Sequence, residues 1–390
     1  MIIPTTVAIT IISLFCLQAL LFILLLLSKK TCTQANALLS LLLGFFALTA
    51  FNLASFYVLV LFGYIQIIPY VQLELLFGLG PSLYLYAKSV TNPCYKISRL
   101  EYLHFLPALL EFIYYRTSWY RNGTISFTER NRNTLNWIFI VEQWSGTITA
   151  SIYIAGSLIL LYNYHVWVKN NYANLHRKTL KWLMKPVIAY ASFWVLWHII
   201  RLADLYIYSD AYRDFYFYPM FIILSAITCW IGYKGYLNTQ IEAVGFLASG
   251  KIPTKSSTPL LASPSGTSQL IRDAMEKDKL YLDMDLNMDS FSNKLGLNPK
   301  QISKVINSEL NMNFHEFVNQ YRVLAFMDRL KQPSHEKLNI WGHALESGFA
   351  SKSTFNHIFK KYSKLTPKAY YHQIRGEIRD KMSEKMISDD

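Results

Sequence analysis

A sharp change in charge content near residue 269 limits what this chain can fold into more than any other feature. Residues 1–269 carry 19 Lys or Arg and 9 Asp or Glu, whereas the 121 residues from 270 to 390 carry 19 and 16. A typical soluble domain has about 25% charged residues. The first part is far below that value, so we expect it to lie in lipid, and the second part to lie in water.

Seven stretches of the first part are apolar and close to the length of about 20 residues that a membrane helix needs. They are 5–28, 37–62, 67–90, 100–116, 145–168, 184–207 and 215–237. The fourth is short, and Gly78, Gly80 and Pro81 interrupt the third. The first stretch has no basic start and is too long for a cleaved signal peptide, so we predict that it is retained. The fold class predicted for residues 1–237 is an all-α bundle of seven transmembrane helices.

The distribution of Lys and Arg over the short loops predicts the orientation of this bundle. The first, third and fifth loops and the end of the seventh stretch are basic, whereas the second loop has no charge and the sixth balances Arg213 with Asp210 and Asp214. The N-terminus is therefore expected outside and the C-terminal part in the cytoplasm. This arrangement is that of a multi-pass membrane protein.

Four ionisable residues within the apolar stretches are candidate functional residues, because burial of such groups in a membrane is costly. Glu74, Glu111, Arg201 and Asp204 all map to the outer half of the membrane, and the last two share a helical face. One interpretation is a polar pocket for an unidentified small ligand. The other is a structural ion pair, or side chains that extend to the interface. The sequence leaves both open.

The segment 238–268 is expected to connect the membrane part to a soluble domain over residues 269–376. Residues 251–268 are rich in Pro, Ser, Thr and Gly, which predicts a flexible linker, and 238–250 is predicted to extend the last span as a short helix. The soluble helices are expected at about 269–277, 288–295, 299–308, 314–331, 338–346, 352–361 and 367–374. Residues 377–390 form a charged tail.

Two segments of the soluble part share the pattern of a helix-turn-helix unit. In the first, the short helix over 289–295 is followed by the turn residue Gly296 and the inward Leu297. Asn298 then caps a second helix, with Pro299 at its first position and Gln301 at its third, which is close to a capping box.

The second unit repeats this order 52 residues later, counted from Gly296 to Gly348. The helix over 340–346 precedes the turn at Ser347 and Gly348, Phe349 points inward, and Ser351 caps the helix over 352–361. The helix over 314–331 joins the two units, and an apolar stripe is expected on it at Phe314, Phe317, Val318, Tyr321, Leu324 and Ala325.

These residues resemble a known family. The stretches SKVINSELNMNFHEFVNQYRV, ALESGFASKSTFNHIFKKYSKLTP and AYYHQIR are similar to the DNA-binding domain of AraC/XylS-type bacterial regulators over about 105 residues. The membrane part, with GPSLYLYAKS at 80–89, more weakly resembles the seven-span sensor regions of some members. The resemblance implies two helix-turn-helix units that place their second helices in the major groove of DNA.

The resemblance also implies which residues read bases. The matching positions are Lys300, Gln301, Ser303 and Lys304 in the first unit, and Lys352, Ser353, Asn356 and His357 in the second. Lys suits guanine, and Gln and Asn suit adenine, although some of these side chains can instead be solvated or contact phosphates. Lys360, Lys361 and the turn at Thr366 and Pro367 are expected to face phosphates.

The sequence departs from the family pattern in two places. His343 stands where an aliphatic residue is usual, which predicts a less apolar or pH-sensitive core in the second unit. Ser363 and Lys364 replace a turn that usually contains Gly. The net charge of residues 270–390 is only +3, from 19 basic and 16 acidic residues, so DNA binding would depend on how the charge is distributed.

The sequence therefore predicts a membrane-embedded transcription regulator that senses a signal and binds double-stranded promoter DNA. The lipid bilayer, a second copy of the chain, RNA polymerase and an unknown small ligand are the other expected partners. The alternative is a transporter-like protein with an appended regulatory domain. No catalytic or metal-binding motif is apparent, and the four cysteines lack metal or disulfide spacing, so no enzyme activity and no cofactor are expected.

Overall fold

The computed structural model describes residues 5–29, 34–64, 67, 70, 75–92, 95–117, 129–175, 178–208, 212–238, 264–331 and 338–376. Within these ranges the secondary structure is helical, apart from an isolated antiparallel bridge between Tyr172 and Asn287. The chain divides into two compact units. The first comprises Met1–Asn163 with Leu180–Gly250, and the second comprises Tyr164–Thr179 with Lys251–Asp390.

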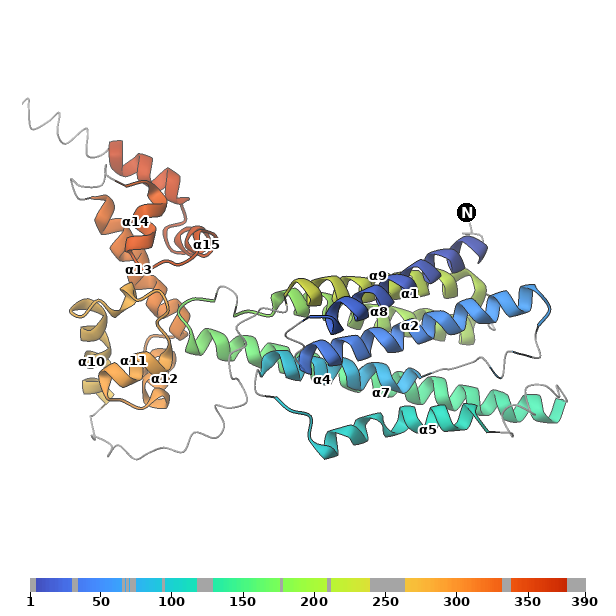
Figure 1. Ribbon diagram of the computed structural model, residues 1–390. Coiled ribbons are helices and arrows are strands. Elements are labelled where there is room, and N and C mark those ends of the chain that lie inside the picture. The colour runs from blue at the N-terminus through green and yellow to red at the C-terminus, as the bar shows by residue number, and fades with distance from the viewer. Residues whose placement is uncertain are drawn as a thin grey trace, which may run out of the picture. The chain divides into compact units, whose positions relative to one another are not determined.

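The first unit is built from long apolar helices (Figure 1). The α-helices are α1 (Thr5–Leu27), α2 (Gln34–Leu61), α4 (Leu79–Thr91), α5 (Leu106–Tyr115), α7 (Glu129–Asn171), α8 (Lys181–Ile207) and α9 (Arg213–Leu237). Helix α1 packs against α2 and α9, α2 also packs against α4, and α8 packs against α9. Two 3₁₀ segments, η2 (Leu76–Gly78) and η3 (Arg99–Phe105), precede α4 and α5.

Five helices of the described residues, not seven, are long and apolar enough to cross a membrane. They are Thr6–Leu27, Gln34–Leu61, Trp144–Asn171, Lys181–Ile207 and Tyr218–Leu237. The third predicted stretch holds the 13-residue helix α4, and the fourth holds the 10-residue helix α5 after its 3₁₀ segment. The fourth and fifth predicted stretches left residues 117–144 between them as a loop, but α7 already begins at Glu129.

The glycines of the third stretch explain why its helix starts late. A Cβ atom at Gly78 would lie 2.4 Å from the ring of Phe45, and one at Gly80 would lie 2.8 Å from the side chain of Tyr153. Gly78 ends the 3₁₀ segment, and α4 begins at the next residue. The glycines therefore permit close packing where the backbone changes from one helical form to the other.

The second unit contains shorter helices with one apolar face each. They are α10 (Pro264–Glu276), α11 (Met288–Leu295), α12 (Pro299–Ser308), α13 (Phe314–Leu330), α14 (Ile340–Glu346), α15 (Lys352–Ser363) and a last helix over 367–376, with the 3₁₀ turn η5 (Leu280–Leu282) after α10. These bounds lie close to the expected ones. The exception is α10, which begins within the expected linker and already buries Thr267. Residues 239–263 and 377–390 lie outside the described ranges.

Helices α11 to α15 each begin with a side chain that caps the helix. Unpaired backbone N–H groups at a helix start need such an acceptor, and Asn and Ser are favoured there. The capping side chains are Asn287, Asn298, Asn313, Asn339 and Ser351, and each accepts a hydrogen bond from a backbone N–H two or three residues on. Local sequence therefore fixes where these helices start.

Helix α13 takes part in two separate hydrophobic cores. Phe314, Phe317 and Val318 belong to the first core with α10, α11 and α12, whereas Val323 and Phe326 belong to the second with α14 and α15. The expected apolar stripe is partly wrong, because Leu324 is 50% exposed. The buried face instead includes two polar residues that the stripe omitted, Asn319 and Arg322.

Candidate DNA-binding interface

The first helix-turn-helix unit consists of α11, a tight turn and α12. Gly296 has a φ of +65°, a left-handed conformation that side-chain-bearing residues rarely adopt. Asn298 Oδ1 accepts a hydrogen bond from the backbone N–H of Lys300 at 2.9 Å, and Gln301 Oε1 accepts one from the N–H of Asn298 at 3.3 Å. The capping box expected from the sequence is thus present, and Leu297 packs against the first core.

One face of α12 is buried and the other is open. Ile302, Val305 and Ile306 are buried in the first core. The four residues expected to read bases lie on the remaining surface: Lys300, Gln301 and Lys304 are exposed, and Ser303 is partly exposed. The structure therefore brings these four side chains to one accessible surface of the helix.

Two of these four side chains already have partners within the chain. The capping bond occupies Gln301 Oε1, and Ser303 Oγ accepts a hydrogen bond from Asn307 Nδ2 at 3.0 Å. A Gln that reads adenine needs both its oxygen and its nitrogen, so base reading by Gln301 would compete with capping. Lys300 and Lys304 are one helical turn apart and are the stronger candidates on α12.

The second helix-turn-helix unit, made of α14, a tight turn and α15, is built in the same way. Gly348 has a φ of +90°, Phe349 is 1% exposed, and Ser351 Oγ accepts a bond from the N–H of Thr354 at 3.5 Å. Helix α15 buries an apolar face made by Phe355, Ile358 and Phe359. Its exposed residues include all six predicted DNA contacts of this unit: Lys352, Ser353, Asn356, His357, Lys360 and Lys361.

Lys361 differs from Lys360 because it forms an ion pair. Its Nζ lies 2.7 Å from Oε1 of Glu316, a residue of the first turn of α13. The bond from Lys361 lowers the pKa of Glu316 below its usual value, and the same bond raises the pKa of Lys361. Glu316 was not among the residues predicted from the sequence. Its spacing of three from Asn313 is that of a capping box and could have marked it, because Glu316 also accepts a hydrogen bond from the N–H of Asn313.

A second missed residue is Arg322, the largest fully buried side chain of the described residues. Its Nε donates to the carbonyl oxygen of Tyr281 at 2.8 Å and its Nη2 donates to that of Asp283 at 2.7 Å. Burial lowers its pKa to about 10, so it stays charged at neutral pH. A Cβ at Gly348 would lie 2.4 Å from the same Tyr281 oxygen. The turn of the second helix-turn-helix unit therefore packs closely against η5.

Both departures from the family pattern have a structural counterpart. His343 is buried in the second unit, at 4% exposure, which agrees with a core that is less purely apolar. Lys364 ends α15 in the left-handed conformation at a φ of +61°, so it takes the geometry that Gly usually provides. Ser363 Oγ donates to the carbonyl oxygen of Phe359 at 2.8 Å and accepts from the N–H of Leu365 at 3.2 Å.

The ionisable residues of the membrane part occupy two places. Asp204 is 2% exposed; its Oδ1 accepts from the N–H of Tyr212 and its Oδ2 from the hydroxyl of Tyr216, both at 3.0 Å. Arg201 Nη1 lies 4.0 Å from Asp204 Oδ2, so the expected pair on one helical face is formed.

The buried Glu111 belongs to α5, and its carboxylate lies at the start of η2 instead. There it accepts hydrogen bonds from the N–H groups of Leu76 at 3.0 Å and Phe77 at 3.3 Å. Glu74 lies outside the described residues. Glu111 and Asp204 thus both accept hydrogen bonds from backbone N–H groups of the fold. The pair of Arg201 and Asp204 agrees with the structural interpretation, and the ligand pocket stays a prediction.

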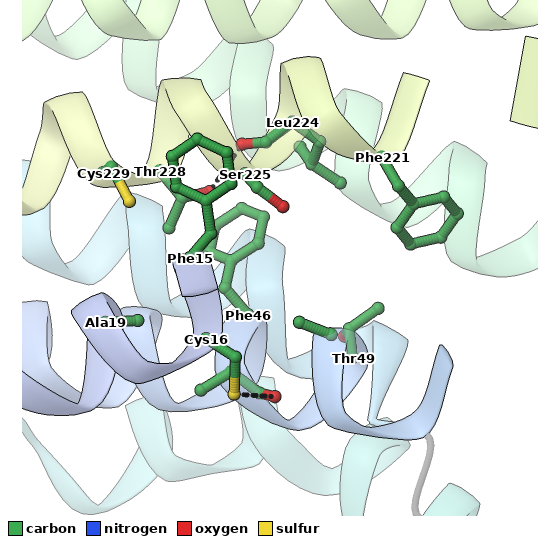
Figure 2. Close-up of a pocket in the computed structure, with 12 residues that line it drawn as sticks. Phe15, Cys16, Ala19, Phe46, Thr49, Phe221, Leu224, Ser225, Thr228 and Cys229 are labelled. Carbon is green, nitrogen blue, oxygen red and sulfur yellow. Dashed lines mark hydrogen bonds between the residues drawn. The ribbon is translucent and has the colours of Figure 1, made fainter. Parts of the chain in front are cut away.

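The first compact unit also has a small pocket between α1, α2 and α9, which these ionisable residues do not line (Figure 2). Its lining is mostly apolar and includes Phe15, Phe46 and Leu224, with the thiols of Cys16 and Cys229. Cys16 Sγ donates to the carbonyl oxygen of Ala47, and Cys229 Sγ donates to Gln18 Oε1, both at 3.4 Å. Over the described residues no group of His, Cys, Asp and Glu is arranged to hold a metal ion.

Comparisons with known proteins concern the second part of the chain. Residues 291–373 match the family model of a helix-turn-helix domain. Over 106 residues the chain is 24% identical to the regulatory protein SoxS of Salmonella typhimurium strain LT2. The aligned region covers 27% of this chain and 96% of SoxS. Over 99 residues it is 29% identical to an uncharacterised helix-turn-helix transcriptional regulator of Staphylococcus aureus strain COL, which covers 24% of this chain and 12% of that protein. No solved structure matches the chain.

These matches confirm a helix-turn-helix domain of the AraC type at residues 291–373, as the sequence predicted, and support a transcription regulator. The matched family model does not reach the apolar helices of the first compact unit, for which membrane location and number of spans stay predictions.

Proposed function

We propose that the chain is a one-component transcription regulator: the apolar helices lie in a bilayer and respond to a signal, and residues 269–376 bind promoter DNA. The observation that carries this proposal is the pair of helices α12 and α15. Each follows a turn with a left-handed glycine, begins at a capped residue and exposes one polar, basic side. A second helix of this kind enters the major groove in helix-turn-helix proteins.

The exposed residues of the two helices suit different roles. Lys300 and Lys304 on α12, and Lys352 and Asn356 on α15, lie one helical turn apart in each helix and are proposed to contact bases, because Lys suits guanine and Asn suits adenine. Lys360, near the end of α15, is proposed to contact phosphate, which positions the protein without reading sequence. Helix α13 is about 25 Å long and would set the separation of the two units.

The surface of α1 supports a location in lipid. Leu14, Leu17 and Leu24 are 60%, 62% and 66% exposed, although they belong to a mainly apolar helix that has no charged residue. Contiguous apolar surface of this kind is unfavourable in water and marks a membrane or an interface.

The proposed topology places the C-terminal domain in the cytoplasm. Lys29 Nζ donates to the carbonyl oxygen of Tyr236 at 2.9 Å, so the C-terminal ends of α1 and α9 lie together, as this topology requires. Helices α4 and α5 follow one another in the sequence. If both cross the membrane, the chain crosses it two more times than if neither does, so the C-terminal domain is on the same side in both cases. A fluorescent reporter fused after Asp390 should therefore be active in the cytoplasm. Activity of an exported reporter at that position would contradict the topology.

The DNA-binding proposal can be tested with the full chain in lipid nanodiscs and a library of random DNA duplexes. We expect enrichment of a site with two half-sites about 10 to 10.5 base pairs apart. Lys300→Ala and Lys352→Ala should each weaken binding to that site by roughly 5- to 150-fold, as loss of a base contact does.

Lys277→Ala is the matched control, because it removes the same charge from an exposed lysine directly after α10, remote from both second helices in sequence. It should bind like the unchanged chain. Failure to enrich any sequence, or an equal effect of all three substitutions, would contradict the proposal.

A further inference from the structure

Residues 164–179, which comprise the end of α7 and most of its connection to α8, belong to the compact unit of the DNA-binding domain. Helix α7 runs without interruption from Glu129 to Asn171, and its last eight residues already belong to this unit. The two residues that follow the helix, Tyr172 and Ala173, make the main contacts with the domain. A segment flanked by two candidate membrane helices is thus part of the DNA-binding unit.

The backbone of this segment pairs with the start of α11. Tyr172 and Asn287 form an antiparallel bridge, and the N–H of Ala173 donates to the carbonyl oxygen of Leu286 at 3.1 Å. The carbonyl oxygen of Ala173 accepts from Nδ1 of His315 at 2.6 Å and from Nδ2 of Asn319 at 3.0 Å. Both backbone polar groups of Ala173 therefore have partners in the domain, as a buried backbone requires.

The side chain of Ala173 completes the first core. Its exposure is 0%, and it belongs to the same cluster as Leu286, Phe291 and Phe314. Asn319, also 0% exposed, is one of the polar residues on the buried face of α13. A buried amide is unfavourable unless it is hydrogen-bonded, and the carbonyl oxygens of Ala173 and His315 provide the partners of Asn319. The domain thus has a polar receptor at the place where the segment inserts.

We propose that Tyr172 and Ala173 form a docking segment, defined as residues 172–173, by which the α7–α8 connection holds the first helix-turn-helix unit in its DNA-competent arrangement. This inference depends on the proposed function, because it states how that function is regulated. The docking segment contacts the cap of α11 and the inner face of α13, while Lys300 and Lys304 on α12 stay exposed. The docked state therefore leaves the recognition surface open and does not block it.

The docking segment provides a short route for a signal. Ala173 follows the end of α7 by two residues, and α8 begins at Lys181, so movement of either helix reaches α11 and α13 through a few residues. The connection through 251–263 is rich in Pro and Ser and is expected to transmit orientation poorly. A signal that moves α7 or α8 would therefore withdraw the docking segment and weaken DNA binding.

Disulfide trapping in membranes tests the docking directly. Residues opposite each other in an antiparallel bridge have Cα atoms about 4.5 to 5.5 Å apart, within the range of a disulfide. In a chain whose native cysteines are replaced by serine, we expect Tyr172→Cys/Asn287→Cys to crosslink readily on mild oxidation. Tyr172→Cys/Asn307→Cys, with its second cysteine on the exposed side of α12, should not.

A protease site inserted between residues 257 and 258 makes the result visible, because only a crosslink then keeps the two fragments together on a non-reducing gel. If the bridge pair crosslinks no faster than the control pair, docking is refuted. This readout does not need DNA, so it is independent of whether the proposed function is correct.

DNA affinity of the full chain in nanodiscs tests the regulatory consequence. Ala173→Asp places a charge in the first core and should weaken binding to the selected site by at least about fivefold, a typical allosteric coupling. Thr179→Asp adds the same charge at a partly exposed residue of the same connection and should have little effect. If the unchanged chain binds DNA and Ala173→Asp binds equally well, the inference is refuted and the proposed function stands. If the unchanged chain selects no DNA although the bridge pair crosslinks, the proposed function fails and the regulatory inference with it.

Discussion

The ammonium nitrogen of Lys361 lies 2.7 Å from a carboxylate oxygen of Glu316, and this ion pair joins α15 to the first turn of α13. The hydroxyl of the neighbouring Tyr362 donates to the backbone oxygen of Glu316 at 3.1 Å. Helix α13 contributes to both cores, so these two bonds connect α15 to the end of α13 that packs in the first core. These two bonds help to keep the two helix-turn-helix units in one arrangement.

This relationship predicts that two neighbouring lysines act differently. Lys360→Ala should reduce the salt dependence of DNA binding by about one phosphate contact, a change of about 0.9 in the slope of log affinity against log salt. Lys361→Ala should leave that slope nearly unchanged, because Glu316 already neutralises Lys361. Titrations of the full chain with its selected site at several salt concentrations measure both. Equal changes in slope would show that Lys361 leaves Glu316 to bind phosphate.

The two turn glycines should differ in their tolerance of alanine. At Gly296 a Cβ would meet nothing within 4 Å, so Gly296→Ala should cost only the left-handed backbone strain, about 1 to 2 kcal/mol. At Gly348 a Cβ would lie 2.4 Å from the carbonyl oxygen of Tyr281, which Arg322 also holds, so Gly348→Ala should destabilise the domain more. Thermal unfolding of the two variants compares them. A smaller loss for Gly348→Ala would contradict the close contact.

The partly buried His315 predicts that the domain loses stability in mild acid. Burial lowers the pKa of His315 to about 4, against opposing effects of its bond to the Ala173 oxygen and of Glu316, while Arg322 and Lys169 lower the pKa further. The unfolded chain binds the proton near pH 6.5, so it holds more protons than the folded chain between pH 6.5 and 4. Stability is therefore fully present above pH 6.5 and is lost as the pH falls towards 4.

The loss should reach up to about 2 kcal/mol at pH 5, where carboxylates still contribute little. Chemical unfolding of the full chain at pH 7 and pH 5 measures it, and His315→Gln should remove most of the difference. The Nδ1 of His315 already carries the proton that it donates to the Ala173 oxygen, so the added proton goes to Nε2. An unchanged pH dependence in the variant would show that His315 is not the titrating group.

Asp204→Asn tests whether the Arg201–Asp204 pair binds a ligand or only supports the fold. The amide keeps the shape of the side chain but removes the charge that faces Arg201 and Tyr216. Under the ligand prediction, reporter transcription should change while membrane insertion, followed by protease accessibility, does not. Loss of insertion or of folded protein would favour the structural role that the contacts of Asp204 indicate.

The sequence predicted the helices of the DNA-binding domain well because their boundaries depend on local chemistry. Asn298 and Ser351 cap the second helix of each unit, and Gly296 and Gly348 adopt the left-handed turns, as their residue types require. Each of these signals acts within a few residues of the chain. They could therefore be recognised without knowledge of the tertiary structure.

Features that depend on distant residues could not be predicted in this way. Ala173 enters a core made by residues more than 90 positions later, and no local pattern marks it. Arg322 is buried because carbonyl oxygens of Tyr281 and Asp283 surround its guanidinium, whereas the apolar stripe suggested only hydrophobic contacts. The shorter α4 likewise reflects packing of Gly78 against the ring of Phe45. In each case tertiary contacts outweighed the pattern in the sequence.

Mapping of the chromosomal DNA bound by the intact, membrane-embedded chain in living cells shows whether this chain binds specific DNA sites from a membrane. We expect a small set of discrete sites with two half-sites, whose occupancy falls when Lys300→Ala and Lys352→Ala are combined and is unaffected by Lys277→Ala. No discrete sites in cells that contain the folded chain, or sites whose occupancy is the same in the double variant, would contradict it.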